Sequence, residues 1–208
     1  MKKLTLLLAI AVSSANLFAQ TSVKLLAKPG TSKVSIPKPG LPASKVDFDA
    51  FESLAAEVKA YRKDRIVDIT KFLAMAKEKN TIILDTRSTE MYNAKHIKGA
   101  IHLDFSDFNV ASLQSLIPDS NTRILIYCNN NIADDPVFYV TKSIQPKQQF
   151  SFLKPQQELT LALNIPTFIN LYGYGYKNVY ELGDLVSAFG NWMNLEGTAV
   201  RKIVTGRN

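Results

Sequence analysis

The chain has 208 residues, of which 25 are Lys or Arg, 18 are Asp or Glu, two are His and one is Cys. A single cysteine excludes an intramolecular disulfide and zinc sites of the Cys₄ and Cys₂His₂ types. Hydrophobic residues make up 46% of the chain and aromatic residues 10%, which is enough for a packed core and argues against a wholly disordered protein. The length fits one domain with appendages.

The net charge of +7 comes from the N-terminal region. Seven lysines and no acidic residue lie within residues 1–46, whereas 18 basic and 18 acidic residues follow from Asp47 onward. Because the body of the chain is neutral overall, nothing in its composition indicates a phosphate-binding face, and no nucleic-acid partner is expected.

Residues 1–19 predict a secretory signal peptide. Two lysines precede an apolar run over residues 4–12, and small and polar residues lead to a cleavage site after Ala19. The apolar run is much shorter than the roughly 20 residues that cross a bilayer, so no membrane span is expected after cleavage. The mature protein is therefore expected to be exported, either to the periplasm or out of the cell.

Residues 20–46 predict a flexible basic linker, because they contain four prolines and five lysines and little that could be buried. Two interpretations are open for this linker: a passive spacer, or a tether to an anionic surface of the cell envelope. Residues 47–208 are left as a single folded domain.

Patterns typical of strands and helices alternate along this domain. Continuous apolar runs predict strands at residues 81–85 and 123–127 that are buried on both faces, and a third strand is predicted at residues 178–182. A short strand is also predicted at residues 66–69. Helices are predicted over residues 46–58, over residues 71–79 with Thr70 as the cap, over residues 107–116, from Asp135-Pro136 onward, and over residues 166–172. This alternation predicts the α/β class, with an open, mainly parallel sheet and helices on both faces.

Two tracts between these elements have open interpretations. Residues 145–157 contain two prolines and five glutamines and predict a surface excursion that carries Phe150, Phe152 and Leu153. These three side chains could form a hydrophobic lid over an adjacent site, or a small contact that pins the loop. The tyrosine- and glycine-rich residues 171–176 could form a surface for a protein partner, or pack in a turn and the core.

Cys128 is the candidate reactive residue. It directly follows the predicted strand at residues 123–127, and ligands of open parallel sheets gather at the carboxyl ends of the strands. The N–H groups of a tight loop and the N-terminus of a following helix would favour the thiolate, which is the reactive form. The alternative is an inert cysteine that packs as a small hydrophobic residue.

Three segments, in order, resemble the signatures of the rhodanese-like domain family. The first runs over residues 83–103 and includes Asp85-Thr86-Arg87 and His96-Ile97-Lys98-Gly99-Ala100. The second is the strand that ends at Cys128, and the third runs over residues 175–183, with Trp192 near the usual terminal aromatic residue. The resemblance extends over about residues 66–192.

This resemblance implies the rhodanese-like fold and sulfur transfer, in which a cysteine thiolate takes sulfane sulfur, forms a persulfide and passes the sulfur on. Cys128 would carry the persulfide. Asp85 and Arg87 would support the cysteine loop, and His96 would have a structural role. The backbone N–H groups of the loop would hold the transferred sulfur; its residues are Asn129, Asn130, Asn131, Ile132 and Ala133. The implied partners are a small sulfur donor and a thiol acceptor, with a protein partner as a further possibility and no cofactor.

The cysteine loop departs from the family pattern, which places glycine three and arginine five residues after the cysteine. Asn131 and Ala133 occupy these positions here, so a dianionic donor such as thiosulfate has no charge partner in the loop. Asp134 and Asp135 would repel anionic donors, although both could instead cap a helix with their carboxylates turned to water. Phosphatase chemistry is excluded, because it requires an arginine at the position of Asp134.

Two functions therefore stay open: a sulfurtransferase that uses a Cys128 persulfide, and a rhodanese-like binding or sensing module with weak turnover or none. A third possibility is metal binding by Cys128 with His96, His102 and the aspartates. These residues lack a recognised ligand spacing, so no metal site is expected.

Overall fold

The computed structural model describes residue 40, residues 44–144 and residues 159–200. The chain divides into two units, 1–44 and 45–208, and every described helix and strand belongs to the second unit. The predicted signal peptide, most of the predicted linker and the predicted excursion with Phe150, Phe152 and Leu153 lie outside the described residues.

The centre of the second unit is a five-stranded sheet in the order β1-β9-β5-β2-β4. All four pairings between neighbouring strands are parallel. The strands, in sheet order, are β1 (Ile66–Val67), β9 (Val179–Leu182), β5 (Arg123–Ile126), β2 (Thr81–Asp85) and β4 (Ile101–His102). The predicted α/β fold with a mainly parallel sheet is confirmed.

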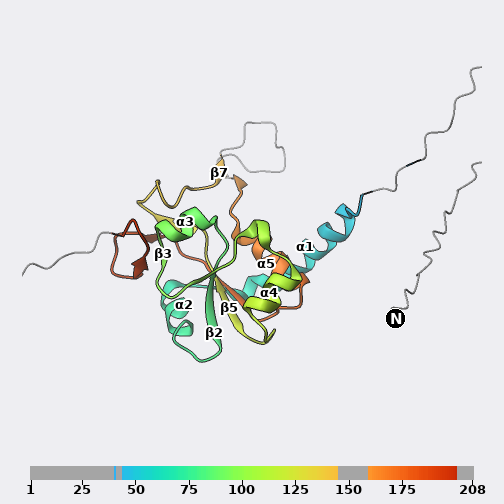
Figure 1. Cartoon of the computed structure of the whole chain (residues 1–208), viewed down its shortest axis with the longest axis horizontal. Coiled ribbons are helices and arrows are strands. Elements are labelled where there is room, and N and C mark those ends of the chain that lie inside the picture. Colours follow the sequence, from blue (N-terminus) through green and yellow to red (C-terminus); the bar gives the residue numbers. More distant parts are fainter. Residues whose placement is uncertain (1–39, 41–43, 145–158, 201–208) are drawn as a thin grey trace, which may run out of the picture. The chain divides into compact units, whose positions relative to one another are not determined.

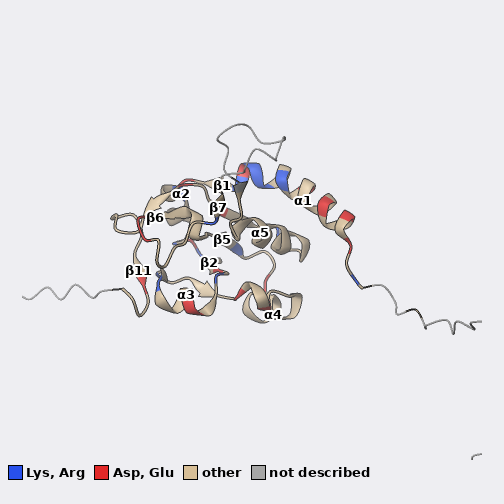
Figure 2. Cartoon of the chain, turned by 90° about the horizontal axis from the view of Figure 1, so that it is seen from above, with Lys and Arg blue, Asp and Glu red and all other residues tan. Residues whose placement is uncertain are grey.

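Helices cover both faces of this sheet (Figure 1, Figure 2). One face is covered by α1 (Phe48–Arg62), α4 (Val110–Leu116) and α5 (Asn164–Gly173), and the other by α2 (Ile69–Met75) and α3 (Thr89–Ala94). Alternate residues of β5 point to opposite faces: Ile124 and Ile126 belong to the core cluster under the first group, and Leu125 belongs to the cluster under the second. Each central strand is thus buried on both sides, as its unbroken apolar run predicted.

Three pairs of two-residue strands lie outside the main sheet. A parallel pair joins β6 (Ile132–Ala133) to β10 (Val186–Ser187). Two antiparallel pairs join β3 (His96–Ile97) to β11 (Leu195–Glu196) and β7 (Ser143–Ile144) to β8 (Leu159–Thr160). Single 3₁₀ turns occur at η1 (Lys63–Arg65), η2 (Phe105–Asp107) and η3 (Asn129–Asn131). These short pairs connect the segments after the central strands to distant parts of the chain.

Capping residues decide where the helices begin. The prediction of Thr70 as a cap was wrong: α2 begins at Ile69, because the side chain of Asp68 accepts a hydrogen bond from the N–H of Lys71 (2.8 Å). Asp47 caps α1 and Asn109 caps α4 in the same way. In α1 the charges also suit the helix dipole, with Asp49 in the first turn and basic residues in the last (Figure 2).

The helix predicted to begin at Asp135-Pro136 is absent from the part of that segment that the structure describes. A single turn forms instead, in which the N–H of Tyr139 donates to the carbonyl of Asp135 (2.8 Å). The residues that follow, Val137 to Thr141, are all β-branched or aromatic, and such residues lose side-chain freedom in a helix. The cap alone is therefore not enough to start a helix.

The tract at residues 171–176 is half buried in the core. Leu171, Tyr172 and Tyr176 are buried, whereas Gly173, Tyr174 and Gly175 are exposed. Across the described ranges, none of the helices combines the length and the apolar character that a membrane span requires.

Candidate functional site

Cys128 lies two residues after the end of β5, the middle strand of the five-stranded sheet, on its carboxyl side. It is 1% exposed. The neighbouring strands β2 and β9 end beside it, so residues that follow three parallel strands meet around this cysteine. This is the position at which open α/β sheets collect ligands and catalytic groups.

The loop after Cys128 is held closed by Asn131. The side-chain oxygen Oδ1 of Asn131 accepts from the N–H of Cys128 (2.9 Å), and its Nδ2 donates to the carbonyls of Leu182 (2.8 Å) and Asp184 (3.3 Å). The N–H of Asn131 donates to the carbonyl of Cys128 (3.0 Å), and the N–H of Ile132 to that of Asn129. Of the five N–H groups predicted to hold a transferred sulfur, that of Asn131 thus reaches both the carbonyl and the side chain of Cys128, whereas that of Ile132 is engaged within the turn.

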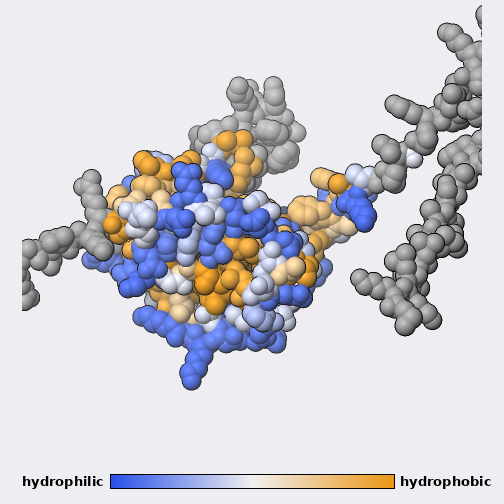
Figure 3. All heavy atoms as spheres, in the orientation of Figure 1, coloured by the Kyte–Doolittle hydropathy of each residue, from blue (hydrophilic) through white to orange (hydrophobic). Residues whose placement is uncertain are grey.

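A segment from outside the loop lies over the cysteine, and we call it the strap (residues 142–144 and 159–163). The side chain of Asn130 donates to the hydroxyl of Ser143 (2.9 Å) and accepts from the N–H of Lys142 (2.9 Å). The N–H of Leu163 donates to Sγ of Cys128 at an N···S distance of 3.2 Å. Apolar surface around β7 (Figure 3) includes the exposed Ile144.

Leu163 is also the N-cap residue of α5. The prediction that the thiol faces a helix N-terminus thus applies to a different helix from the one that the sequence suggested at Asp135. The positive end of the helix dipole of α5 lies at the sulfur, where it favours a negative charge.

Asp85 and Arg87 form a buried ion pair at the end of β2. The Nη2 of Arg87 lies 2.7 Å from Oδ2 of Asp85, and the hydroxyl of Tyr127 donates to the same carboxylate. The guanidinium also donates to the carbonyls of Lys95 (2.7 Å) and Phe138 (3.1 Å). The Nη1 of Arg87 also lies 3.5 Å from the side-chain oxygen of Asn129, the first residue of the cysteine loop. Arg87 therefore connects the strand end to both ends of the segment 129–138.

Two pKa shifts indicate a structural role for this network. Burial by itself lowers the pKa of Arg87, but the hydrogen bonds and charge of Asp85 outweigh burial, so that its pKa is raised above the ordinary arginine value. Burial, followed by the charge of Asp85, raises the pKa of Tyr127 well above its ordinary value. Both groups keep their protons at physiological pH, so neither can act as an acid or base there.

The two histidines lie against one aromatic ring. His96 stacks on Tyr92 at a centroid distance of 3.8 Å, with Nδ1 2.6 Å from the Tyr92 carbonyl and Nε2 3.4 Å from the carboxylate of Glu196. His102 stacks on the same ring at 4.6 Å and bonds through Nε2 to the carbonyl of Arg87 (2.8 Å). Among the residues that the structure describes, no group of three His, Cys, Asp or Glu side chains could hold a metal ion.

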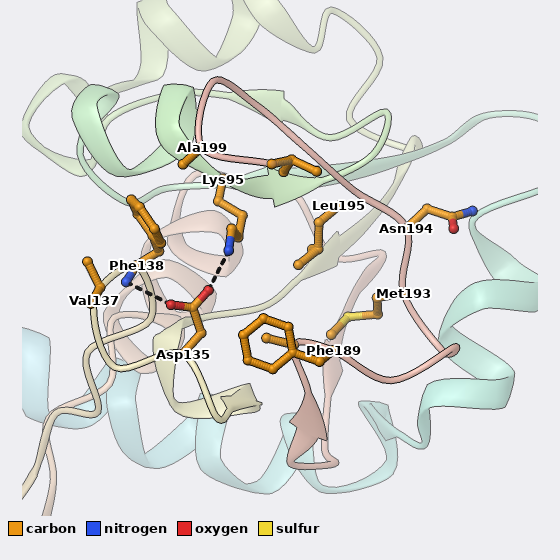
Figure 4. A pocket seen from close by; sticks show the side chains of 11 residues that line it. Lys95, Asp135, Val137, Phe138, Phe189, Met193, Asn194, Leu195 and Ala199 are labelled. Carbon is orange, nitrogen blue, oxygen red and sulfur yellow. Dashed lines mark hydrogen bonds and ion pairs between the residues drawn. The ribbon is translucent and has the colours of Figure 1, made fainter. Parts of the chain in front are cut away.

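The paired aspartates after the loop have different surroundings. Asp134 is exposed and has a left-handed backbone conformation (φ 67°). Asp135 is buried, and its Oδ2 accepts from Nζ of Lys95 at 2.7 Å (Figure 4). The prediction that both carboxylates turn to water was therefore wrong for Asp135. Lys95 could not be identified from the sequence as the partner of Asp135, because the two residues are 40 positions apart.

This Lys95–Asp135 pair lies at the wall of a cavity of about 860 Å³, whose other walls are mostly apolar (Figure 4). Phe138, Phe189 and Met193 contribute to these walls, and Cys128 does not line the cavity. The chain thus has a mostly apolar hollow that is separate from the cysteine.

The fold and site together define an α/β domain with a single cysteine loop at the carboxyl end of its central parallel strand. The rhodanese-like domain model matches residues 68–183, more than half of the chain. The chain belongs to the rhodanese-like domain family.

Several solved structures are similar to the chain. The BH2092 protein of Bacillus halodurans has 18% sequence identity and a TM-score of 0.39, with 73% of this chain and 88% of that chain covered. A thiosulfate sulfurtransferase of Pseudomonas aeruginosa has 17% identity and a TM-score of 0.41, with 71% and 23% covered. A rhodanese of E. coli, crystallised with anions, has 17% identity and a TM-score of 0.33, with 57% and 99% covered. No curated protein matches the chain.

Proposed function

We propose that this domain is a sulfurtransferase that carries sulfane sulfur on Cys128 and passes it to a thiol. The observation that carries the proposal is the environment of the sulfur: Cys128 follows the carboxyl end of the central strand, and its Sγ accepts the N–H of Leu163 at the N-terminus of α5. An N–H donor and the positive end of a helix both favour the thiolate, which is the nucleophile of such a reaction.

The reaction consists of two displacements on sulfur. The Cys128 thiolate attacks the outer sulfur of a donor persulfide, RS–SH; a new S–S bond forms, the donor S–S bond breaks, and RS⁻ leaves with the bonding electron pair. Cys128 then carries S–SH. The thiolate of an acceptor attacks that outer sulfur, which gives an acceptor persulfide and restores the Cys128 thiolate. No net oxidation or reduction occurs, and no cofactor is needed.

The surroundings of the loop favour a thiol persulfide or polysulfide over thiosulfate as the donor. The residues from Asn129 to Ala133 are uncharged, and Asp134 beside them is exposed. Arg87 reaches the loop, with Nη1 3.5 Å from the side-chain oxygen of Asn129, but its guanidinium is engaged by Asp85 and by two carbonyls. A dianion would therefore meet no free positive side chain in the loop itself.

The roles proposed for the supporting residues follow from their contacts. Asp85 fixes Arg87, and Arg87 holds the segment after Cys128 through the Phe138 carbonyl. His96 anchors the turn before β4 by its hydrogen bond to Tyr92 and its contact with β11. None of these three side chains is proposed to transfer a proton.

The test is intact-protein mass spectrometry after anaerobic incubation with polysulfide, glutathione persulfide or thiosulfate, with Cys128→Ser as the control. The expected result is a persulfide adduct on the wild type alone, with polysulfide or glutathione persulfide and not with thiosulfate, that is lost when a thiol is added. Absence of an adduct with every donor, in a folded and reduced protein, would overturn the proposal.

The second candidate is a rhodanese-like binding module, which two observations favour. The sulfur is buried beneath the strap, and the cavity of about 860 Å³ is lined by Lys95, Asp135 and apolar residues but not by Cys128. A module of this kind would bind its ligand equally well after Cys128→Ser substitution, whereas the sulfurtransferase would lose its function.

We also propose that the protein is exported, with residues 1–19 removed. The lysines and the short apolar run at the start of the chain support this proposal. The measurement is the intact mass of the protein recovered from the cell envelope and the medium. A chain that begins at Gln20 is expected there, and a full-length chain that stays in the cytoplasm would contradict export.

A further inference from the structure

We infer that the main-chain N–H of Leu163 is the group that stabilises and positions the Cys128 thiolate, and that the strap supplies it from outside the cysteine loop. This inference deepens the proposed function, since it concerns the nucleophile of that reaction. Leu163 is 35 positions away from Cys128 in the sequence.

The geometry of this donor is set by two elements. Leu163 has a helical backbone conformation (φ −68°, ψ −23°) as the N-cap of α5, and its N–H points at Sγ with an N···S distance of 3.2 Å. Its carbonyl accepts from the N–H of Thr167 (3.0 Å), and the hydroxyl of Thr167 lies 2.9 Å from that of Thr86, next to the ion-paired end of β2. The donor is therefore fixed relative to the sheet.

The cysteine loop is poorly placed to supply the same stabilisation. Asn131, which stands where the family has glycine, takes up the N–H of Cys128 with its side chain, and its own N–H is shared between the carbonyl and the side chain of Cys128. The loop therefore offers the sulfur one shared N–H from a three-residue 3₁₀ turn. A donor from another segment compensates for this, because one N–H and the dipole of a ten-residue helix act together on the sulfur.

The strap also contacts the cysteine loop. It is tied to the loop by Asn130, which bonds to Ser143 and to the N–H of Lys142, and it is tied to itself by the bond from the N–H of Leu161 to the Lys142 carbonyl (2.6 Å). The strap therefore has two effects on the thiol that can be measured separately. The N–H of Leu163 bonds to the sulfur, and the ties of the strap to the loop limit access to it.

The test is an amide-to-ester exchange at Leu163, made by incorporating the hydroxy acid analogue of leucine, which removes this N–H with almost no change in volume. The rate of alkylation by iodoacetamide is followed against pH; in this reaction the thiolate forms the S–C bond and iodide leaves. Loss of one hydrogen bond to an anion should move the midpoint of the profile upward by about one to two pH units. The rate at high pH should not fall.

The matched control is the same exchange at Leu161, whose N–H bonds within the strap and not to sulfur. It should leave the midpoint within a few tenths of a pH unit of the wild type. A second variant, Ser143→Ala, releases one tie of the strap; it should raise the midpoint by less than the Leu163 ester does and increase the rate at high pH severalfold.

An unchanged midpoint in the Leu163 ester, or an equal shift in the Leu161 ester, would overturn the inference. Failure of the proposed sulfur transfer has a different signature. In that case no persulfide adduct forms on the wild type, while the shift of the alkylation midpoint in the Leu163 ester is still observed.

Discussion

The buried Asp85–Arg87 pair offers a direct test of what holds the cysteine loop in place. Asp85 is 0% exposed and Arg87 is 3% exposed. The substitution Asp85→Asn keeps the shape of the side chain but removes the charge, and it leaves a buried guanidinium without its counter-ion. Removing one partner of a buried pair costs about 3–5 kcal/mol, which is a large part of the roughly 5–15 kcal/mol that stabilises a typical domain.

The assay is urea unfolding at neutral pH, followed by circular dichroism. With a slope of about 2 kcal/mol per molar urea, the midpoint should fall by about 1.5–2.5 M. The exposed ion pair between Arg123 and Glu78 (2.5 Å) provides the control, since Glu78→Gln should cost at most about 1 kcal/mol. Equal losses in the two variants would refute the reasoning, because burial would then make no difference to the contribution of the pair.

Three further predictions concern packing, hydrogen bonding and pH. Gly183→Ala would place its new methyl group 2.6 Å from a side-chain carbon of β1 and should cost about 1–3 kcal/mol in urea unfolding, whereas Gly190→Ala, whose nearest neighbour is at 3.5 Å, should change stability by at most about 0.5 kcal/mol. Thr167→Val leaves the buried hydroxyl of Thr86 without its partner at 2.9 Å and should cost about 1–3 kcal/mol; the double variant with Thr86→Val should lose less than the sum of the two single variants. A hydrogen bond from the backbone N–H of Ser106 holds the pKa of Asp104 below its usual range. The resulting stabilisation is present above the ordinary carboxyl pKa and is lost as the pH falls through the lowered value. Asp104→Asn should therefore unfold more easily than the wild type at neutral pH, and a gap between their urea midpoints that widens on acidification would contradict this sign.

The central strands could be predicted from the sequence because burial on both faces leaves a simple pattern. Residues 81–85 and 123–127 are unbroken apolar runs, and in the structure they form the neighbouring strands β2 and β5. The position of Cys128 at the carboxyl end of β5 follows from the same pattern. These features depend on local composition and on the rules of parallel sheets, both of which a single sequence contains.

The details of the site could not be predicted, because they depend on contacts between distant residues. Asp135 has the position of a helix cap, yet its carboxylate pairs with Lys95, and no pattern in the sequence links the two. The donor to the sulfur is the backbone N–H of Leu163. Every residue except proline has such a group, so the sequence does not indicate which residue supplies it. Asn131 could be recognised as a departure from the family's glycine, but not as the side chain that closes the loop.

The closure of the cysteine loop has a consequence for the order in which the chain can mature. The side-chain amide of Asn131 bonds to the carbonyls of Leu182 and Asp184, and β6, at the end of the loop, pairs with β10 at Val186–Ser187. The ribosome delivers these partners more than 50 residues after Cys128. Until they arrive, the loop around the chain's one thiol is not closed, and the thiol is open to oxidants and to other thiols. The thiol is therefore most open to reaction during synthesis, before residues 182–187 have closed the cysteine loop.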